Sequence, residues 1–323
     1  MPVVARKLAA ILAATVVAVQ MWFALPATVA AATAGADVVA SIAPVHSLVA
    51  KVMAGVGEPR LLVVGGLSPH TYALKPSDAR ALANARAVFW IGPELERFLE
   101  KPLAALAGDV GVVRLGKAVG VRVLAARKAG AWAEAAHGHG QKHAHDDRDE
   151  VDAHLWLDPS NAARMVDAVV AALSRTDAAN AGRYRANGET TLAALRGLET
   201  EIRTTLKPVA GIPYLVFHDA FQYFEARFGL AALGAVAVSA ERSPGARRIA
   251  ELRQRIRGQG AVCMFTQPQF EPALAKTLTE GTGARIGVLD DLGAGLDPGP
   301  GLYDELLRSL ARSLVGCLKP VQR

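Results

Sequence analysis

Three histidines and one aspartate lie at places where an α/β protein often holds metal ligands. His70 lies in the loop after the apolar run 61–64, and His154 opens the run 154–157. His218 ends the run 214–218, and Asp290 follows the run 285–289. Ligands of open α/β sheets bind outside the carboxyl ends of strands, so these side chains can converge. Three imidazole nitrogens and one oxygen would suit tetrahedral Zn(II).

The segments that carry these residues alternate between strand and helix patterns. Strands are predicted at 38–42, 61–64, 88–91, 112–113, 121–124, 154–157, 214–218, 261–265 and 285–289. Helix starts are indicated by Pro44, by Asp158 before Pro159, and by Asp219. The alternation predicts an α/β fold with largely parallel sheets.

A long helix is predicted in the middle of the chain. Leu192, Leu195, Leu198, Ile202 and Leu206 keep a helical period until Pro208. A helix of about 30 residues spans about 45 Å, enough to connect two lobes. We therefore expect a first lobe at 37–176, a linker helix at 177–207 and a second lobe at 208–323, with a metal cleft between the lobes. The alternative is a single exposed surface helix.

The N-terminal segment has the layout of a secretory signal peptide. Arg6 and Lys7 precede the apolar run 8–19, and small residues follow Pro26. This pattern predicts a signal peptide over residues 1–32, with an uncleaved membrane anchor as the alternative. Because no cysteine lies near the cleavage region, we expect an exported, soluble protein without an N-terminal lipid anchor.

The chain is mildly basic, with a formal net charge of +6. The arginines are scattered over helical segments such as 247–257 rather than gathered in one stripe. This distribution does not favour a nucleic-acid partner, and we expect a monomer.

Two cysteines, Cys263 and Cys317, are the whole cysteine content. In an exported protein they suggest one disulfide, which the chain-entropy model values at roughly 4 kcal/mol for a loop of this length. Two buried thiols or a cysteine-containing metal site are the alternatives. A metal role is disfavoured because neither cysteine lies in a CxxC pair or beside a histidine.

Residues 126–151 differ from the rest of the chain. They contain four histidines and an acidic run but no hydrophobic period, which predicts a loop. The histidines are His137, His139, His143 and His145.

Several segments together resemble a known family. They are Gly66 to Asp78, Val88 to Glu96, Asp152 to Pro159, Val216 to Phe224, Cys263 to Phe270 and Val288 to Gly293. In this order they resemble the ZnuA-like substrate-binding proteins of ABC-type high-affinity zinc uptake systems, within the wider zinc/manganese-binding family. The resemblance covers residues 38–318.

The resemblance implies a carrier rather than an enzyme. It places the family's ligands on His70, His154 and His218, a carboxylate position on Asp290, and the family disulfide on Cys263 and Cys317. It implies two lobes that close slightly on Zn(II), which a periplasmic protein delivers to a membrane permease. Histidine at position 218, where manganese-binding relatives usually have glutamate, favours zinc because Mn(II) prefers oxygen ligands.

Two departures from the family pattern leave the fourth ligand open. Pro69 stands where some zinc-binding members have an acidic residue, and Gln267 replaces a glutamate. Asp290, a water molecule or an open position remain possible. The resemblance also suggests that His137, His139, His143 and His145 capture zinc weakly, against the alternative of a solvated linker.

The sequence leaves three alternative functions open. A manganese or iron carrier of the same family is one. A zinc hydrolase is another, with Glu225 as a remote candidate base, although the chain has no HExxH motif. A surface adhesin is a third, and the lack of a cysteine for a lipid anchor counts against it.

Overall fold

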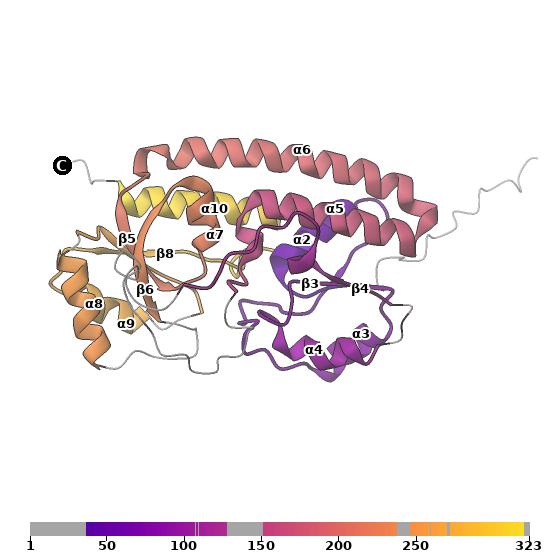
Figure 1. Ribbon diagram of the computed structural model, residues 1–323, viewed down its shortest axis with the longest axis horizontal. Coiled ribbons are helices and arrows are strands. Elements are labelled where there is room, and N and C mark those ends of the chain that lie inside the picture. Colours follow the sequence, from indigo (N-terminus) through magenta and orange to yellow (C-terminus); the bar gives the residue numbers. More distant parts are fainter. Residues whose placement is uncertain are drawn as a thin grey trace, which may run out of the picture. The chain divides into compact units, whose positions relative to one another are not determined.

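The computed structural model describes residues 37–106, 108, 110–127, 151–237, 246–258, 260–269 and 272–319. These residues belong to one compact unit. They form two four-stranded parallel sheets with helices packed against them (Figure 1). Among these residues, no helix combines the length and apolar character needed to cross a membrane. The predicted signal peptide at 1–32 lies outside the described residues.

The first sheet has the strand order β2-β1-β3-β4. Its strands are β1 (Val38–Ala40), β2 (Arg60–Leu61), β3 (Ala87–Trp90) and β4 (Gly111–Arg114). Every residue of β1 and β3 is buried, as expected for central parallel strands covered on both faces. The helices of this lobe are α2 (Ala43–Val52), α3 (Pro76–Ala83) and α4 (Arg97–Ala104).

The second sheet repeats this topology with the order β6-β5-β7-β8. Its strands are β5 (Pro213–His218), β6 (Ala231–Ala237), β7 (Cys263–Thr266) and β8 (Arg285–Val288). Its helices are α7 (Gln222–Phe228), α8 (Ala246–Gly258) and α9 (Pro272–Thr279). The sequence did not predict β6, because four of its seven residues are alanine, which has a low strand propensity.

Both sheets have a topological switch point between their two central strands. The chain leaves β1 toward β2 on one side and returns to β3 on the other, and β5, β6 and β7 repeat this path. Clefts in α/β proteins open at such points, beyond the carboxyl ends of the strands. His218 is the last residue of β5 and therefore lies at the second switch point.

Three long helices lie along the two sheets, and the longest of them runs beside each of the other two (Figure 1). They are α5 (Pro159–Thr176), α6 (Ala181–Leu206) and α10 (Leu302–Leu318). Helix α6 has 26 residues and is the predicted long helix, and a short 3-10 turn at Ala178–Asn180 separates it from α5. Helix α10 contacts both α2 and α6, so the contacts between elements do not divide the chain at residues 176 and 208. The lobe boundaries at these residues therefore remain a prediction.

Three local predictions were wrong. Residues Leu155–Leu157 form a 3-10 helix instead of a strand, and all three side chains are buried. Residues 121–124 form no strand, and only the isolated bridge between Ala125 and Val151 follows them. Asp219 does not cap α7, whose N-cap is Phe221. Its carboxylate instead accepts hydrogen bonds from Arg127.

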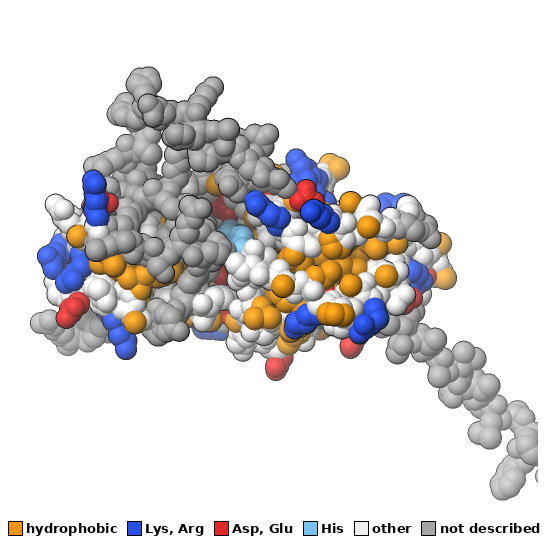
Figure 2. Space-filling view, turned by 90° about the horizontal axis from the view of Figure 1, so that it is seen from below, with side chains coloured by type: hydrophobic (Ala, Val, Ile, Leu, Met, Phe, Trp, Pro, Cys, Tyr) orange, Lys and Arg blue, Asp and Glu red, His pale blue; other side chains and the backbone are white. Residues whose placement is uncertain are grey.

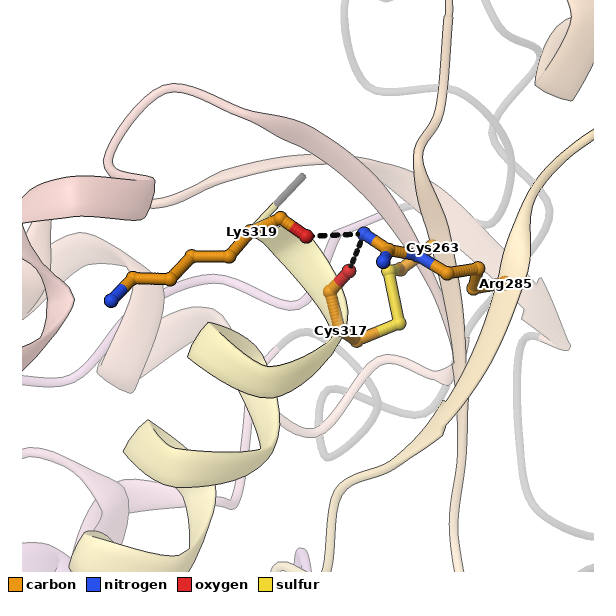
Figure 3. The surroundings of a disulfide bond; sticks show 4 residues. All are labelled: Cys263, Arg285, Cys317 and Lys319. Carbon is orange, nitrogen blue, oxygen red and sulfur yellow. Dashed lines mark hydrogen bonds between the residues drawn. A yellow bond between two sulfur atoms is a disulfide. The ribbon is translucent and has the colours of Figure 1, made fainter. Parts of the chain in front are cut away.

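The two cysteines form the disulfide that the family resemblance implied. Cys263 is the first residue of β7, Cys317 lies in the last turn of α10, and their Cα atoms are 6.2 Å apart (Figure 3). Arg285 donates hydrogen bonds to the carbonyl oxygens of Cys317 and Lys319, the latter at 2.7 Å. The end of α10 is thereby fixed to the second sheet, and the alternatives of free thiols or a cysteine metal site are excluded.

Candidate metal centre

The three predicted histidines meet at one place. His70, His154 and His218 each offer a ring nitrogen, and these nitrogens lie within 4.8 Å of one another. The ring centroids are 5.6 Å apart for His70 and His154, 5.8 Å for His70 and His218, and 5.1 Å for His154 and His218. Figure 2 shows histidine atoms at the surface of one face, with acidic side chains beside them.

The loop that carries His70 is held at both ends. After His70, the Tyr72 hydroxyl donates to Asp78 Oδ2 at 2.8 Å, and the same oxygen accepts from the Lys75 amide at the start of α3. Tyr72 is buried and packs on Phe98 with a centroid distance of 5.0 Å. Two buried anchors therefore fix the loop from which His70 projects.

Before His70, the loop touches the second lobe. Gly66 has a φ of +74°, and a Cβ atom at this position would lie 2.8 Å from the Cβ of Ala294. A glycine is required here both by the left-handed backbone and by the close approach. The loop with His70 and the loop after β8 thus meet directly.

His154 is oriented by Asp152. The Asp152 Oδ1 atom lies 2.8 Å from His154 Nδ1 and accepts from the His154 amide at 3.0 Å. Both side chains are buried. With Nδ1 donating to the carboxylate, the lone pair of His154 is on Nε2, which is buried and has no hydrogen-bond partner among the described residues. This is the carboxylate–histidine arrangement found around protein-bound metals.

His218 comes from the second lobe. It is buried at the end of β5, and the strand register between β5 and β7 continues to place Gln267 beside it. The Gln267 side chain interacts with the His218 ring and donates to Asp291 Oδ1 at 2.7 Å. The third histidine therefore lies beside a polar side chain that is itself anchored.

The surroundings affect proton binding to the three imidazoles differently. Burial, together with a smaller effect of the neighbouring His154, lowers the pKa of His70 to about 3. Burial also lowers the pKa of His218 well below its usual value. Burial opposes protonation of His154 too, but Asp152, with smaller effects of Asp291 and Asp219, outweighs it, and the pKa of His154 is raised. At neutral pH, His70 and His218 are therefore neutral and able to act as metal ligands.

Asp290 is not among the described residues whose ligand atoms lie within 4.8 Å of one another. Its Oδ1 atom accepts from the amides of Leu292 at 3.0 Å and Gly293 at 2.8 Å, so it stabilises the turn after β8. The adjacent Asp291 is buried, and its charge acts on His154. Burial raises the pKa of Asp291.

Other histidines lie elsewhere. His46 is buried in α2, where Nε2 lies 2.9 Å from the carbonyl oxygen of Pro59, as expected for a structural residue. His137, His139, His143 and His145 lie outside the described residues.

Sequence reasoning missed a buried ion cluster next to the site. Arg127 of the first lobe forms ion pairs with Asp219 and Glu225 of the second lobe. Asp219 directly follows His218. No local pattern could have indicated this cluster, because Arg127 and its partners are more than 90 positions apart in the sequence.

Chemically, the cluster presents imidazole nitrogen donors from two lobes. Two Nε2 atoms, of His70 and His154, are buried and have no hydrogen-bond partner among the described residues. Buried polar atoms without partners are costly unless a ligand satisfies them. Three imidazoles at this spacing match a tetrahedral Zn(II) site with one further position.

Comparison with known proteins agrees with this geometry. The family model described as "Zinc-uptake complex component A periplasmic" matches residues 38–317. The chain is 44% identical over 306 residues to the high-affinity zinc uptake system protein ZnuA of Brucella abortus (strain 2308), covering 87% of this chain and 91% of that protein. It is 37% identical over 294 residues to the protein of the same name from Yersinia pestis, covering 88% and 92%.

The fold is also shared with a solved structure. A crystal structure of ZnuA superposes with a TM-score of 0.73 at 23% identity, covering 88% of this chain and 100% of that chain. At this identity the likeness supports the fold of two parallel-sheet lobes with a long helix. The extent of the family match and the identity to curated relatives show that the chain belongs to the ZnuA family of periplasmic zinc-uptake components.

Proposed function

We propose that this protein binds Zn(II) through His70, His154 and His218 and delivers it to an ABC-type membrane permease for import. The observation that carries the proposal is the convergence of three ring nitrogens within 4.8 Å from two lobes. Membership of the zinc-uptake family supports zinc as the cargo. The protein captures and releases the ion, and no covalent bond is broken.

The donor set favours zinc over manganese or iron. Three imidazoles suit Zn(II), whereas Mn(II) prefers carboxylate and other oxygen ligands. Burial keeps His70 and His218 neutral, and a neutral imidazole is the form that binds metal. We therefore expect zinc to displace manganese from this site in a direct competition.

A hydrolase is not favoured. Glu225, the remote candidate base, is buried and engaged by Arg127 at 2.7 Å and by the Tyr214 hydroxyl at 3.2 Å. Asp152 is engaged by His154. A general base must reach a water molecule at the metal, and neither carboxylate is free to do so.

The fourth donor is proposed to be an oxygen. Asp290 holds two amides through Oδ1, so it would bind the metal through Oδ2, with a water molecule as the alternative. Asp291 is anchored by Gln267 and acts on the site through its charge.

The proposed function in zinc uptake also implies where the protein works. We propose that residues 1–32 are removed on export and that the mature protein works as a monomer in the periplasm. The Cys263–Cys317 disulfide is typical of an oxidising compartment. We further propose that His137, His139, His143 and His145 bind zinc weakly beside the main site.

Zinc titration of single variants tests the proposal. The single variants His70→Ala, His154→Ala and His218→Ala should each lower the affinity for zinc by about 100-fold or more, because each removes one of the three histidine ligands. His46→Gln is the matched control, since His46 is equally buried but bonded to Pro59. If the three variants bind zinc as tightly as the control, the assigned site is wrong.

A further inference from the structure

A buried ion cluster connects the two lobes beside the histidines. The Arg127 Nε atom donates to Asp219 Oδ2 at 2.9 Å, and Nη1 donates to Glu225 Oε2 at 2.7 Å. A further hydrogen bond runs from Arg127 Nη2 to Asp219 Oδ1. The side chains are 19%, 11% and 5% exposed for Arg127, Asp219 and Glu225. We call these three residues the Arg127 cluster.

The second-lobe side of the cluster is the corner that carries His218. Asp219 is joined to His218 by one peptide bond, and Glu225 lies in α7, the helix that follows. The other oxygen of Glu225 accepts from Tyr214 in β5. Arg127 therefore holds the end of β5 and the start of α7 together through one guanidinium group.

The first-lobe side leads to His154. Ala125, two residues before Arg127, pairs with Val151, and the Asp152 amide donates to the Leu124 carbonyl oxygen at 3.0 Å. The Tyr223 hydroxyl of α7 donates to the Asp152 carbonyl oxygen and accepts from the Leu124 amide, both at 2.8 Å. The segment that carries Arg127 is thus bonded to the segment that orients His154.

We propose that Arg127 is a positioning residue for metal binding, which fixes His218 of the second lobe relative to His154 of the first. This inference rests on the proposed three-histidine site. Two like charges, Asp219 and Glu225, are buried at the same corner and would repel each other without a shared cation. The planar fork of arginine reaches both carboxylates at once, which a lysine ammonium does not do with the same geometry.

The chain offers a matched control arginine. Arg227 of α7 also bonds across the lobes, with Nε 2.7 Å from Asp158 Oδ1 and Nη2 2.8 Å from Asp158 Oδ2. Asp158 is the N-cap of α5 and bonds to the Ser160 amide, so this pair fixes the start of α5. Arg227→Lys therefore removes a bidentate ion pair between the lobes without changing the contacts of Asp219 and Glu225 beside His218.

The experiment compares Arg127→Lys with Arg227→Lys in the mature protein. We expect Arg127→Lys to raise the zinc dissociation constant about 10-fold through faster dissociation, in line with the effect of other residues that orient metal ligands. Arg227→Lys should change it less than twofold. Cobalt absorption gives a second readout, because the visible bands report ligand geometry and should shift only in Arg127→Lys. Urea unfolding of both variants separates affinity from stability.

The outcomes separate this inference from the proposed function. If Arg127→Lys has a lower free energy of unfolding but binds zinc and cobalt as the wild type does, Arg127 is only structural and the inference fails. If Arg127→Lys does not fold, Glu225→Gln replaces it, and unchanged zinc affinity there overturns the inference. If instead the variants of the three histidines retain tight zinc, the proposed function itself has failed.

Discussion

At the scale of single residues, the three imidazoles share a task but have different surroundings. Burial, helped by the neighbouring imidazoles, keeps His70 and His218 neutral, whereas the Asp152 carboxylate favours a proton on His154. The same carboxylate directs the lone pair of His154 Nε2 toward the other two rings by accepting from Nδ1. Asp152 therefore both orients a ligand and makes it the imidazole of the three that binds a proton most readily.

This difference predicts the pH dependence of zinc binding. Protonated imidazole cannot bind zinc, so affinity is full above the raised pKa of His154 and falls as pH drops below it. One proton is displaced, so we expect a loss of about tenfold per pH unit between pH 6 and pH 4. The loss should become steeper only near pH 3, where His70 titrates.

Asp152→Asn provides the matched variant for this titration. The amide can still accept from Nδ1, but it lacks the charge that raises the pKa of His154. We expect about 10-fold weaker zinc binding at pH 8 and a fall that begins at lower pH than in the wild type. Zinc affinity measured by competition with a chelator at pH 5 to 8 checks both. An identical pH profile in the two proteins would contradict this role of Asp152.

At the scale of elements, loops at strand ends carry the site and helices hold those loops. His218 ends β5, and His70 lies in a loop anchored on α3 through Tyr72 and Asp78. Residues 126–151, which contain His137, His139, His143 and His145, are called here the histidine-rich insertion. At its two ends Ala125 pairs with Val151, immediately before Asp152. The insertion therefore leaves and rejoins the fold next to the second histidine.

This attachment point leads to a prediction for the insertion. Removing residues 136–147 should leave one tight zinc ion per protein and abolish weaker binding, because the deletion removes four imidazoles but none of the three in the cluster. Replacing the four histidines by glutamine is the control that keeps the length. Calorimetric titration gives the stoichiometry, and the idea is abandoned if weak binding persists in both variants.

At the scale of the whole molecule, sequence patterns predicted much of the fold and the three histidines. Apolar runs with helix starts between them were enough for seven of the eight strands that the structure describes and for the long helix, because these signals are local. The 3-10 helix at Leu155–Leu157 was missed because a short buried apolar run fits either structure. The role of Arg127 was missed because its partners are distant in sequence and only the fold brings them together.

The central claim is that one zinc ion binds between the lobes on His70, His154 and His218. The most direct test is a crystal structure of the mature protein loaded with one equivalent of zinc, with anomalous diffraction measured at the zinc edge. We predict a single strong anomalous peak about 2.0–2.1 Å from one ring nitrogen of each histidine. The same map identifies the fourth donor. A principal peak elsewhere, with any of the three imidazoles turned away from the metal, would contradict the account.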